Sequence, residues 1–358
     1  MSKILYAASN MSHINNFHTA YINALRRDGH DVKVMAKGDG ADFDIPFVKK
    51  MFSRGNTACR REIKRIVARE KFDVIILNTA LAAFHIRFAL PKKNRPKVIN
   101  ISHGYLFNEK TPSLKEKLLL FCEKLLVRKT DTVMVMNEED VRIVRDNHLA
   151  KNPPVMTLGM GATTPDAVAS RDEVRREMMS DDAYVISFVG ELSDRKNQRM
   201  LIASLPEIKM HIPNAMLWLI GEGDKKGELI ALADRLGMRD SVIFAGRRSN
   251  PCDFIRASDL YVSASKIEGM PFNLIEALGT GATILCSDVK GHRDLIEDGV
   301  TGFLFPSNDS RAFIDRTVEI YRTGARPNAD AVAAVYEKYS FDNVFDKTYS
   351  AIKEAVES

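Results

Sequence analysis

Short apolar segments alternate with amphipathic segments along the whole chain, and this alternation constrains the fold more than any other feature. Apolar runs of strand length occur first at residues 3–8 and last at residues 283–286, and the segments between them repeat apolar residues at helical spacing. Alternating strands and helices are typical of parallel α/β architecture. Because 358 residues exceed one ordinary core, we expect two α/β domains, although a single larger barrel would also fit the length.

The same plan is expected in both halves of the chain. In the first half we expect strands at residues 3–8, 31–36, 72–77, 98–101 and 132–136, and helices at 15–28, 57–70 and 113–129. In the second half we expect strands at 185–189, 215–220, 242–244, 260–262 and 283–286, and helices at 197–211, 226–236, 250–257, 272–278 and 311–322. Pro153, Pro154 and the Gly- and Thr-rich residues 159–165 predict a linker. Two open sheets joined in this way would form a cleft at the carboxyl ends of their strands, where such folds bind ligands.

Charge is distributed unevenly between the two halves. Residues 1–165 hold 28 Lys and Arg against 16 Asp and Glu, a net charge of +12, whereas residues 166–358 hold 24 against 31, a net charge of −7. A basic half indicates an anionic partner. Composition alone leaves open a nucleic acid, a phospholipid surface and a merely solvated basic surface.

Other features of the composition exclude several classes of protein. The four cysteines contain no Cys-x-x-Cys pair, so neither a zinc site nor a disulfide framework is indicated. The longest apolar runs are far shorter than the roughly 20 residues that span a bilayer. The first residues lead directly into an expected strand without the organisation of a signal peptide, so we expect a cytoplasmic protein.

The expected strand at 260–262 leads into a helix start that is suited to an anion. Pro271 falls in the first turn, where its missing N–H costs nothing. The free backbone N–H groups there, together with the helix dipole, would form a site for a phosphate. The residues expected to contribute these groups are Gly269, Met270, Phe272 and Asn273.

Two glutamates, Glu268 and Glu276, flank this helix start at a spacing of eight residues. Since a phosphate repels a carboxylate, we expect each glutamate to bind hydroxyl groups instead, those of a sugar on one side and of a ribose on the other. Taken alone, the pair would be explained equally well by two solvated glutamates at a helix start. The neighbouring motifs favour the binding role.

This segment resembles the Glu-x7-Glu signature of retaining glycosyltransferases with the GT-B fold, of the family-4 type. The resemblance covers nearly the whole chain and is clearest from Val189 to Phe305, with further matching pieces at residues 219–223, 244–247, 257–260 and 299–305. It implies an α/β protein with two Rossmann-like domains facing across a cleft. Residues 1–165 would bind the acceptor, residues 166–335 would bind the nucleotide sugar, and a C-terminal helix at residues 336–358 would cross back to the first domain.

The resemblance also implies roles for residues outside this segment. Arg195 and Lys196, which follow Gly190 at the start of a helix, match the basic pair that grips the diphosphate in this family. The family often carries Arg directly after that glycine, whereas this chain has Glu191. Two surface cations are the alternative, but cations at a helix N-terminus are unfavourable without an anion nearby.

Three isolated positions complete the implied site. Gly223 would let the backbone approach the ligand closely, Arg247 matches the segment that holds the base, and His103 matches the histidine that reaches the donor sugar. An ordinary turn, a solvated arginine and a histidine bonded within its loop are the alternatives. Asp42 and Asp44 form an Asp-x-Asp pair in an expected surface loop, which we interpret as solvated.

The candidate catalytic residues are therefore His103, Arg195, Lys196 and Glu268, and the candidate ligand-binding residues are Gly190, Gly223, Arg247, Gly269, Met270, Pro271, Phe272, Asn273 and Glu276. Because two cations supply the positive charge, no metal ion and no other cofactor is expected.

By resemblance, the expected activity is retaining transfer of a hexose or N-acetylhexosamine from a UDP-sugar to a growing, lipid-linked surface glycan such as a bacterial capsule or exopolysaccharide. The expected helix at 113–129 and the cations Arg60, Arg61, Lys64, Arg65 and Arg69 would rest on anionic lipid at the inner face of the cell membrane, and no nucleic acid is expected as a partner. The alternatives are another GT-B enzyme, such as a UDP-sugar epimerase, and a non-catalytic binder of anionic surfaces. A phosphorylase is disfavoured because the chain lacks a pyridoxal-phosphate lysine signature.

Overall fold

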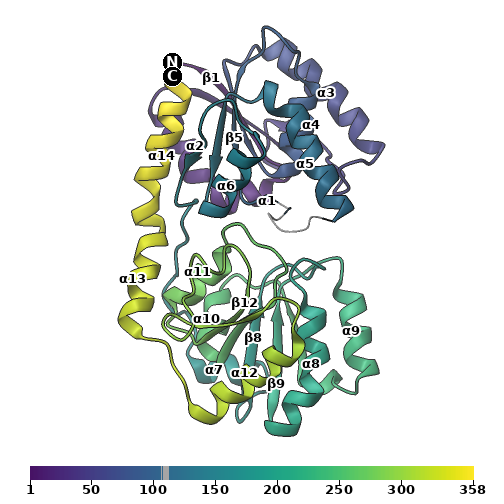
Figure 1. Ribbon diagram of the computed structural model, residues 1–358, viewed down its shortest axis with the longest axis vertical. Helices are drawn as coiled ribbons and strands as arrows, with labels where there is room; N and C mark the ends of the chain where they lie inside the picture. Colours follow the sequence, from purple (N-terminus) through teal and green to yellow (C-terminus); the bar gives the residue numbers. More distant parts are fainter. Residues whose placement is uncertain (106, 108–112) are drawn as a thin grey trace. The chain divides into compact units, whose positions relative to one another are not determined.

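The computed structural model describes residues 1–105, 107 and 113–358, with only the backbone at Lys115, and the chain forms two compact units. The first unit contains Met1–Met160 and Val344–Ser358, and the second contains Gly161–Asn343. Each is built on one parallel sheet covered by helices (Figure 1), which confirms the expected α/β class with two sheets.

Within the described residues, the first unit has a seven-stranded parallel sheet in the order β3-β2-β1-β4-β5-β6-β7. Its strands are β1 (Lys3–Ala7), β2 (Asp31–Ala36), β3 (Phe43–Asp44), β4 (Val74–Asn78), β5 (Lys97–Ile101), β6 (Thr132–Val135) and β7 (Val155–Met156). Its helical elements are α1 (Met11–Phe17), α2 (Thr19–Arg27), α3 (Gly55–Glu70), α4 (Ala80–Ala89), α5 (Leu114–Leu126), η1 (Val127–Lys129), α6 (Glu138–Asp146) and most of α14 (Phe341–Glu357). Figure 1 shows α3, α4 and α5 on one side of this sheet and α2 and α14 on the other.

The last helix belongs to the core of the first unit. The ring of Phe345 in α14 lies 4.9 Å from the ring of Tyr21 in α2, and Lys353 forms an ion pair of 2.6 Å with Asp28 at the end of α2. Thr348 donates a buried hydrogen bond of 2.8 Å to the carbonyl of Gly159. These contacts fix the C-terminal helix on the sheet that the N-terminal residues begin.

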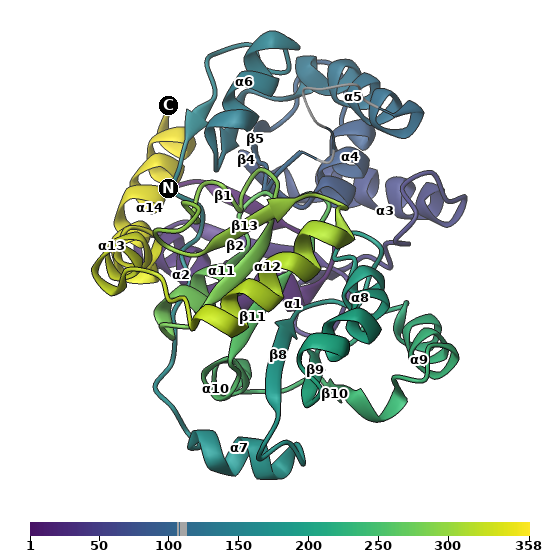
Figure 2. The same ribbon diagram turned by 60° about the horizontal axis from the view of Figure 1, so that its bottom comes forward.

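The second unit has, within the described residues, a six-stranded parallel sheet in the order β10-β9-β8-β11-β12-β13. Its strands are β8 (Tyr184–Val189), β9 (Ala215–Ile220), β10 (Val242–Gly246), β11 (Leu260–Ser263), β12 (Ile284–Asp288) and β13 (Phe303–Pro306). Its helical elements are α7 (Arg171–Glu177), α8 (Gln198–His211), α9 (Lys226–Arg235), η2 (Arg239–Ser241), α10 (Pro251–Ala257), α11 (Phe272–Gly279), α12 (Ser310–Thr323) and α13 (Ala329–Tyr339). Figure 2 shows α8 and α12 together on one face of this sheet, where they share a hydrophobic cluster with β8 and β9.

The expected helix at residues 15–28 is wrong in one respect, because the structure divides this segment into two helices. The first begins earlier, at Met11, and ends at Phe17, and His18 leaves helical geometry with φ −122° and ψ −12°. The ring of His18 is buried, with Nδ1 2.9 Å from the hydroxyl of Tyr6. A continuous helix would not let residues 13 and 18 face the same side, since five residues rotate the chain by about 140°.

Several elements carry no sequence signal of the expected kind. Helix α4 is apolar on most of its surface and buries Ala82, Phe84 and Ile86, so it lacks the amphipathic period that marked the other helices. Strands β3 and β7 have two residues each, which is too short for a pattern. Among the described residues, no helix is long and apolar enough to cross a membrane.

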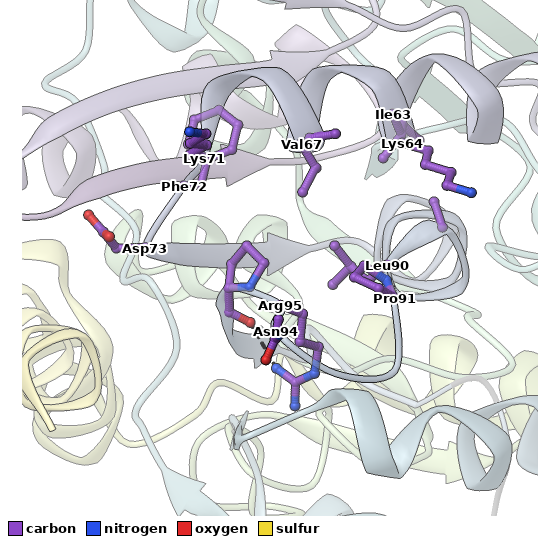
Figure 3. A pocket seen from close by; sticks show the side chains of 13 residues that line it. Ile63, Lys64, Val67, Lys71, Phe72, Asp73, Leu90, Pro91, Asn94 and Arg95 are labelled. Carbon is purple, nitrogen blue, oxygen red and sulfur yellow. Dashed lines mark hydrogen bonds between the residues drawn. The ribbon is translucent and has the colours of Figure 1, made fainter.

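Each sheet reverses its strand order at one point, between β1 and β4 in the first unit and between β8 and β11 in the second. Ligands of open α/β sheets bind at the carboxyl ends of the strands at such a point. A pocket of about 550 Å³ in the first unit lies at the opposite end of the strands (Figure 3), because Asp73 and Pro96 in its wall immediately precede β4 and β5. The functional site is therefore expected at the carboxyl ends of the strands.

Candidate active site

A buried carboxylate and two cations meet at the switch point of the second sheet. Glu268 lies in the loop after β11, and Arg195 and Lys196 lie in the loop after β8. One carboxylate oxygen of Glu268 is 2.6 Å from Nη1 of Arg195, and the other is 2.7 Å from Nζ of Lys196. The backbone N–H of Lys266 donates to the carbonyl of Arg195 at 2.9 Å, which ties the two loops together. The structure thus brings together three of the four predicted catalytic residues.

The electrostatics of this triad favour its ionised form. Burial raises the pKa of Glu268, but Lys196 and Arg195 lower it more, and the result is a pKa of about 2. Burial lowers the pKa of Lys196, and the Glu268 carboxylate opposes that shift. The side chains of Glu268 and Lys196 are only 6% and 9% exposed, whereas that of Arg195 is 37% exposed. Two cations and one carboxylate give the triad a net positive charge, and the nearby Glu191 also raises the pKa of Lys196.

Helix α11 begins beside this triad, as the sequence predicts. Pro271 is the residue before the first helical residue, and its carbonyl accepts from Leu274 N–H at 2.9 Å. The first turn of any helix leaves backbone N–H groups without an intrahelical acceptor. The positive end of α11 therefore lies in the same loop that carries Glu268, two residues beyond Gly269.

The side chain of Asn273 is used internally, whereas only its backbone N–H is predicted to serve a ligand. Its Nδ2 donates to the carbonyl of Val189 and to the hydroxyl of Tyr261, each at 2.8 Å. These bonds fix the start of α11 to the ends of β8 and β11. The side-chain nitrogen of Asn273 is therefore a positioning group.

Glu276 lies one turn into α11 and is half-buried. Among the described residues its carboxylate has no hydrogen-bond or ion-pair partner, and burial raises its pKa to about 7. Its backbone carbonyl accepts from Thr164 Oγ1 at 3.2 Å. An unpartnered carboxylate in a part-buried place is available to accept hydrogen bonds from hydroxyl groups.

The predicted glycines lie where two chain segments nearly touch. A Cβ on Gly221 would lie 1.9 Å from the carbonyl oxygen of Gly190, and a Cβ on Gly223 would lie 2.1 Å from the carbonyl oxygen of Leu192. Gly190 itself has φ +148°. The close approach that Gly223 permits is therefore to the loop after β8, and it holds that loop, which carries the two cations, against the end of β9.

Arg247 and His103 are placed differently from each other. Arg247 follows β10, is exposed, and has no contact partner among the described residues. His103 follows β5 in the first unit, and both its ring nitrogens are buried without a hydrogen-bond partner in the described part of the chain. His103 packs edge-on against the rings of His13 and His18, at centroid distances of 4.9 and 5.1 Å.

Sequence reasoning missed two residues that support the triad. His292 is fully buried, holds the carbonyl of Ser287 at 2.7 Å through Nδ1, and lies near enough to Glu268 to affect its pKa. Gln198 donates to the carbonyl of Glu191 at 2.8 Å and accepts from Ser193 N–H, which fixes the loop of the cations. The sequence did contain a signal for His292: a Gly-His pair shortly after a strand. A histidine at the end of a strand is the same feature that identified His103 as a candidate.

Comparison with known families gives two consecutive matches. The model described as Glycosyltransferase Family 4 matches residues 16–157, and the model described as Glycosyl transferases group 1 matches residues 170–330. Together they cover most of the chain.

Individual proteins resemble the chain along most of its length. EpsD of Bacillus subtilis (strain 168), described as a putative glycosyltransferase, is 29% identical over 333 residues, which are 89% of this chain and 87% of EpsD. A UDP-Gal:alpha-D-GlcNAc-diphosphoundecaprenol alpha-1,3-galactosyltransferase of Escherichia coli is 22% identical over 264 residues, 72% of this chain and 68% of that protein. Among solved structures, HepE of Anabaena in complex with UDP and glucose has a TM-score of 0.77 at 18% identity and covers 99% of this chain and 100% of its own.

Sucrose-phosphate synthase of Thermosynechococcus elongatus gives a TM-score of 0.80 at 16% identity, with 99% of each chain covered. The two doubly wound sheets therefore define a GT-B fold, and the protein is a glycosyltransferase. The chain belongs to the family-4 type of GT-B glycosyltransferases.

Proposed function

We propose that this enzyme transfers a hexose or N-acetylhexosamine from a UDP-sugar, with retention of configuration, to a growing lipid-linked glycan. The observation that carries the proposal is the triad of Arg195, Lys196 and Glu268 beside the start of α11. Two cations and a helix N-terminus are suited to the charge that develops on a departing diphosphate. The names of the E. coli relative, a UDP-Gal-dependent enzyme, and of HepE, solved with UDP and glucose, support UDP as the nucleotide.

Each residue then has a chemical task. Arg195 and Lys196 stabilise the β-phosphate as it leaves, and Glu276 accepts hydrogen bonds from the ribose hydroxyls. Glu268 and the N–H groups of Gly269 and Met270 orient the sugar, and Arg247 contacts the base. By the family resemblance, His103 is assigned to the donor sugar. Since the cations supply the positive charge, the transfer step itself requires no metal.

The bond changes follow a front-face displacement. The glycosidic C1–O bond to the β-phosphate breaks, UDP leaves with the electron pair, and the acceptor hydroxyl forms a new bond to C1 on the same face. The departing phosphate takes the acceptor proton. We prefer this route because Glu268, the nearest carboxylate, is held by two cations, which reduces its nucleophilicity.

Nucleotide binding and transfer test the proposal directly. UDP is expected to raise the unfolding temperature of the wild type more than GDP does. Lys196→Ala should abolish this protection. Lys226→Ala should retain it, because Lys226, the first residue of α9, is part-exposed and paired with Glu222. With UDP-sugars and a diphosphate-lipid-linked acceptor, NMR should show a product with the anomeric configuration of the donor. Inversion of the anomer, or epimerised donor without any acceptor, would contradict the proposal.

We also propose that the first unit rests on anionic membrane through α5. Four large apolar side chains repeat along one face of this helix and are exposed to 87%, 46%, 57% and 61%: Leu114, Leu118, Phe121 and Leu125. Exposed lysines, Lys117 and Lys124, lie beside this stripe. An exposed apolar stripe flanked by cations is typical of a helix that lies in the membrane interface.

Sedimentation with vesicles tests the membrane contact. The wild type should bind vesicles that contain phosphatidylglycerol and not those of phosphatidylcholine alone, and Phe121→Glu should reduce binding at least tenfold. Met210→Glu is the matched control, since Met210 is 78% exposed in the second unit. Equal loss in both variants, or no binding by the wild type, would refute the contact.

A further inference from the structure

Three histidines meet at the carboxyl ends of the strands in the first unit. His13 lies in α1, His18 lies between α1 and α2, and His103 follows β5. One ring nitrogen from each can be chosen so that all three lie within 4.8 Å of one another. The Nε2 atoms of His13 and His18 share a hydrogen bond of 3.1 Å, which a bound metal ion would replace. Of these three histidines, only His103 is among the candidate catalytic residues.

The break in the helix at His18 creates this cluster. In a continuous helix, residues 13 and 18 would point about 140° apart. The end of α1 at Phe17 and the irregular geometry of His18 instead turn its imidazole back toward His13. The break therefore brings together the imidazoles of His13 and His18, which regular helical geometry would have separated, and His103 lies beside them.

The bonding of the cluster leaves capacity for a ligand. His18 is fixed through Nδ1 by the Tyr6 hydroxyl at 2.9 Å, so its Nε2 faces His13. Both ring nitrogens of His103 are buried without a hydrogen-bond partner among the described residues, which is costly for a polar group. A ring nitrogen of an uncharged imidazole can coordinate a metal ion.

We propose that His13, His18 and His103 form a binding site for a divalent transition-metal ion, with Zn²⁺ as the ion that best suits three imidazoles. Zinc bound by histidine has Zn–N distances of about 2.0–2.1 Å, which places tetrahedral nitrogens about 3.3 Å apart. The pair of His13 and His18 already has nearly this spacing, whereas the nitrogen of His103, within 4.8 Å of both, has to move closer to complete it. Three histidines leave the fourth position open, as in sites that accept an exchangeable ligand.

Tyr6 supports this site as a positioning residue. A metal-bound imidazole generally bonds a partner through its other nitrogen, which fixes the ring and its tautomer. The buried hydroxyl of Tyr6 performs this task for Nδ1 of His18. Zinc binding affects the proposed function in one respect: His103 is assigned there to the donor sugar, so zinc and the sugar would compete for the same imidazole.

The test is zinc binding by the metal-free, full-length protein, in competition with a chromophoric zinc indicator and without any sugar donor. The wild type is expected to bind one Zn²⁺ per chain. His13→Ala and His103→Gln should each weaken binding by more than about 100-fold, and Tyr6→Phe by about tenfold. His148→Asn is the control, because His148 is exposed in the same unit and its φ of +55° suits asparagine.

Cobalt gives a second readout. Co²⁺ bound by the wild type should show the intense visible absorption of a tetrahedral site, and the signal should be lost in His13→Ala but kept in His148→Asn. Circular dichroism of each variant shows whether it has folded. The proposal is overturned if folded His13→Ala binds zinc as the wild type does, or if the wild type binds no zinc. Because no donor takes part, failure here leaves the proposed glycosyl transfer untouched, and failure of UDP protection leaves the zinc result untouched.

Discussion

The unpartnered carboxylate of Glu276 predicts a measurable dependence of stability on pH. Burial raises its pKa from the ordinary 4.5 to about 7. The folded chain then holds this proton up to about pH 7, whereas the unfolded chain releases it near pH 4.5. The favourable contribution of the protonated group is therefore complete below pH 4.5 and is lost as the pH rises through 7. A shift of this size corresponds to at most about 3 kcal/mol.

Glu276→Gln removes this titration and keeps the size of the side chain. Relative to the wild type, the variant should gain stability as the pH rises from 4.5 to 8, by up to about 3 kcal/mol. The difference between the two proteins is the quantity to compare, because buried His292, whose pKa is lowered to about 4, gives the wild type an opposite slope. That slope is common to both proteins and cancels.

The single tryptophan of the chain provides the assay. Trp218 is fully buried in β9, so its fluorescence in urea reports unfolding of the second unit, which contains Glu276. Glu228→Gln is the control, since the Glu228 side chain on α9 is 64% exposed, and its difference from the wild type should be nearly constant with pH. A Glu276→Gln difference that stays constant between pH 5 and 8 would refute the reasoning.

Three further predictions concern the same unit. Gly221→Ala should destabilise the second unit by several kcal/mol or prevent its folding, because the new Cβ would lie 1.9 Å from the carbonyl oxygen of Gly190. Gly227→Ala is the control: there is open space around Gly227 in helix α9, so the substitution should stabilise the unit by about 0.5–1 kcal/mol. Trp218 fluorescence in urea measures both effects. Asn273→Ala should cost about 1–3 kcal/mol by leaving the buried hydroxyl of Tyr261 without its donor, and the same assay would contradict this if stability were unchanged. Glu268→Gln should destabilise the unit by about 3–5 kcal/mol, because Lys196 loses its buried counter-charge. Calorimetry should nevertheless show that the variant binds UDP at least as tightly as the wild type, although sugar transfer is lost. Weaker UDP binding by the folded variant would contradict the assigned roles.

Long amphipathic segments and buried strands could be predicted from the sequence because their burial follows a regular period. The strand at residues 31–36 and the helix that starts at Phe272 fall where the pattern places them. Helix α4 could not be predicted in this way, since it is covered on most sides. The break in the helix at His18 depends on the buried contact of His18 with Tyr6. Tyr6 lies twelve residues earlier in the chain, so no local propensity encodes the break.

The site shows the same division between local and long-range information. Strand ends, a proline at a helix start and neighbouring cations indicate where an anion binds, and Arg195, Lys196 and Glu268 do meet. The pairing among these three residues could not be predicted, because they come from loops about 70 residues apart that only the strand order brings together. The internal uses of Asn273 and of the glycine loops likewise depend on partners distant in sequence.

Pairing of Glu268 with both cations has a consequence for how the proposed site would act. Arg195 and Lys196 are adjacent in the chain, and Lys196 is buried, so without an anion they would repel each other and the lysine would lose its charge more readily. The carboxylate of Glu268 keeps Lys196 charged and holds both cations in place before a donor arrives. Preorganised charge costs no rearrangement when negative charge develops on a departing phosphate, which is where electrostatic catalysis gains most. Because Glu268 also neutralises one of the two cations, the site attracts the intact donor less than two free cations would, and it keeps part of its binding energy for the more highly charged leaving group.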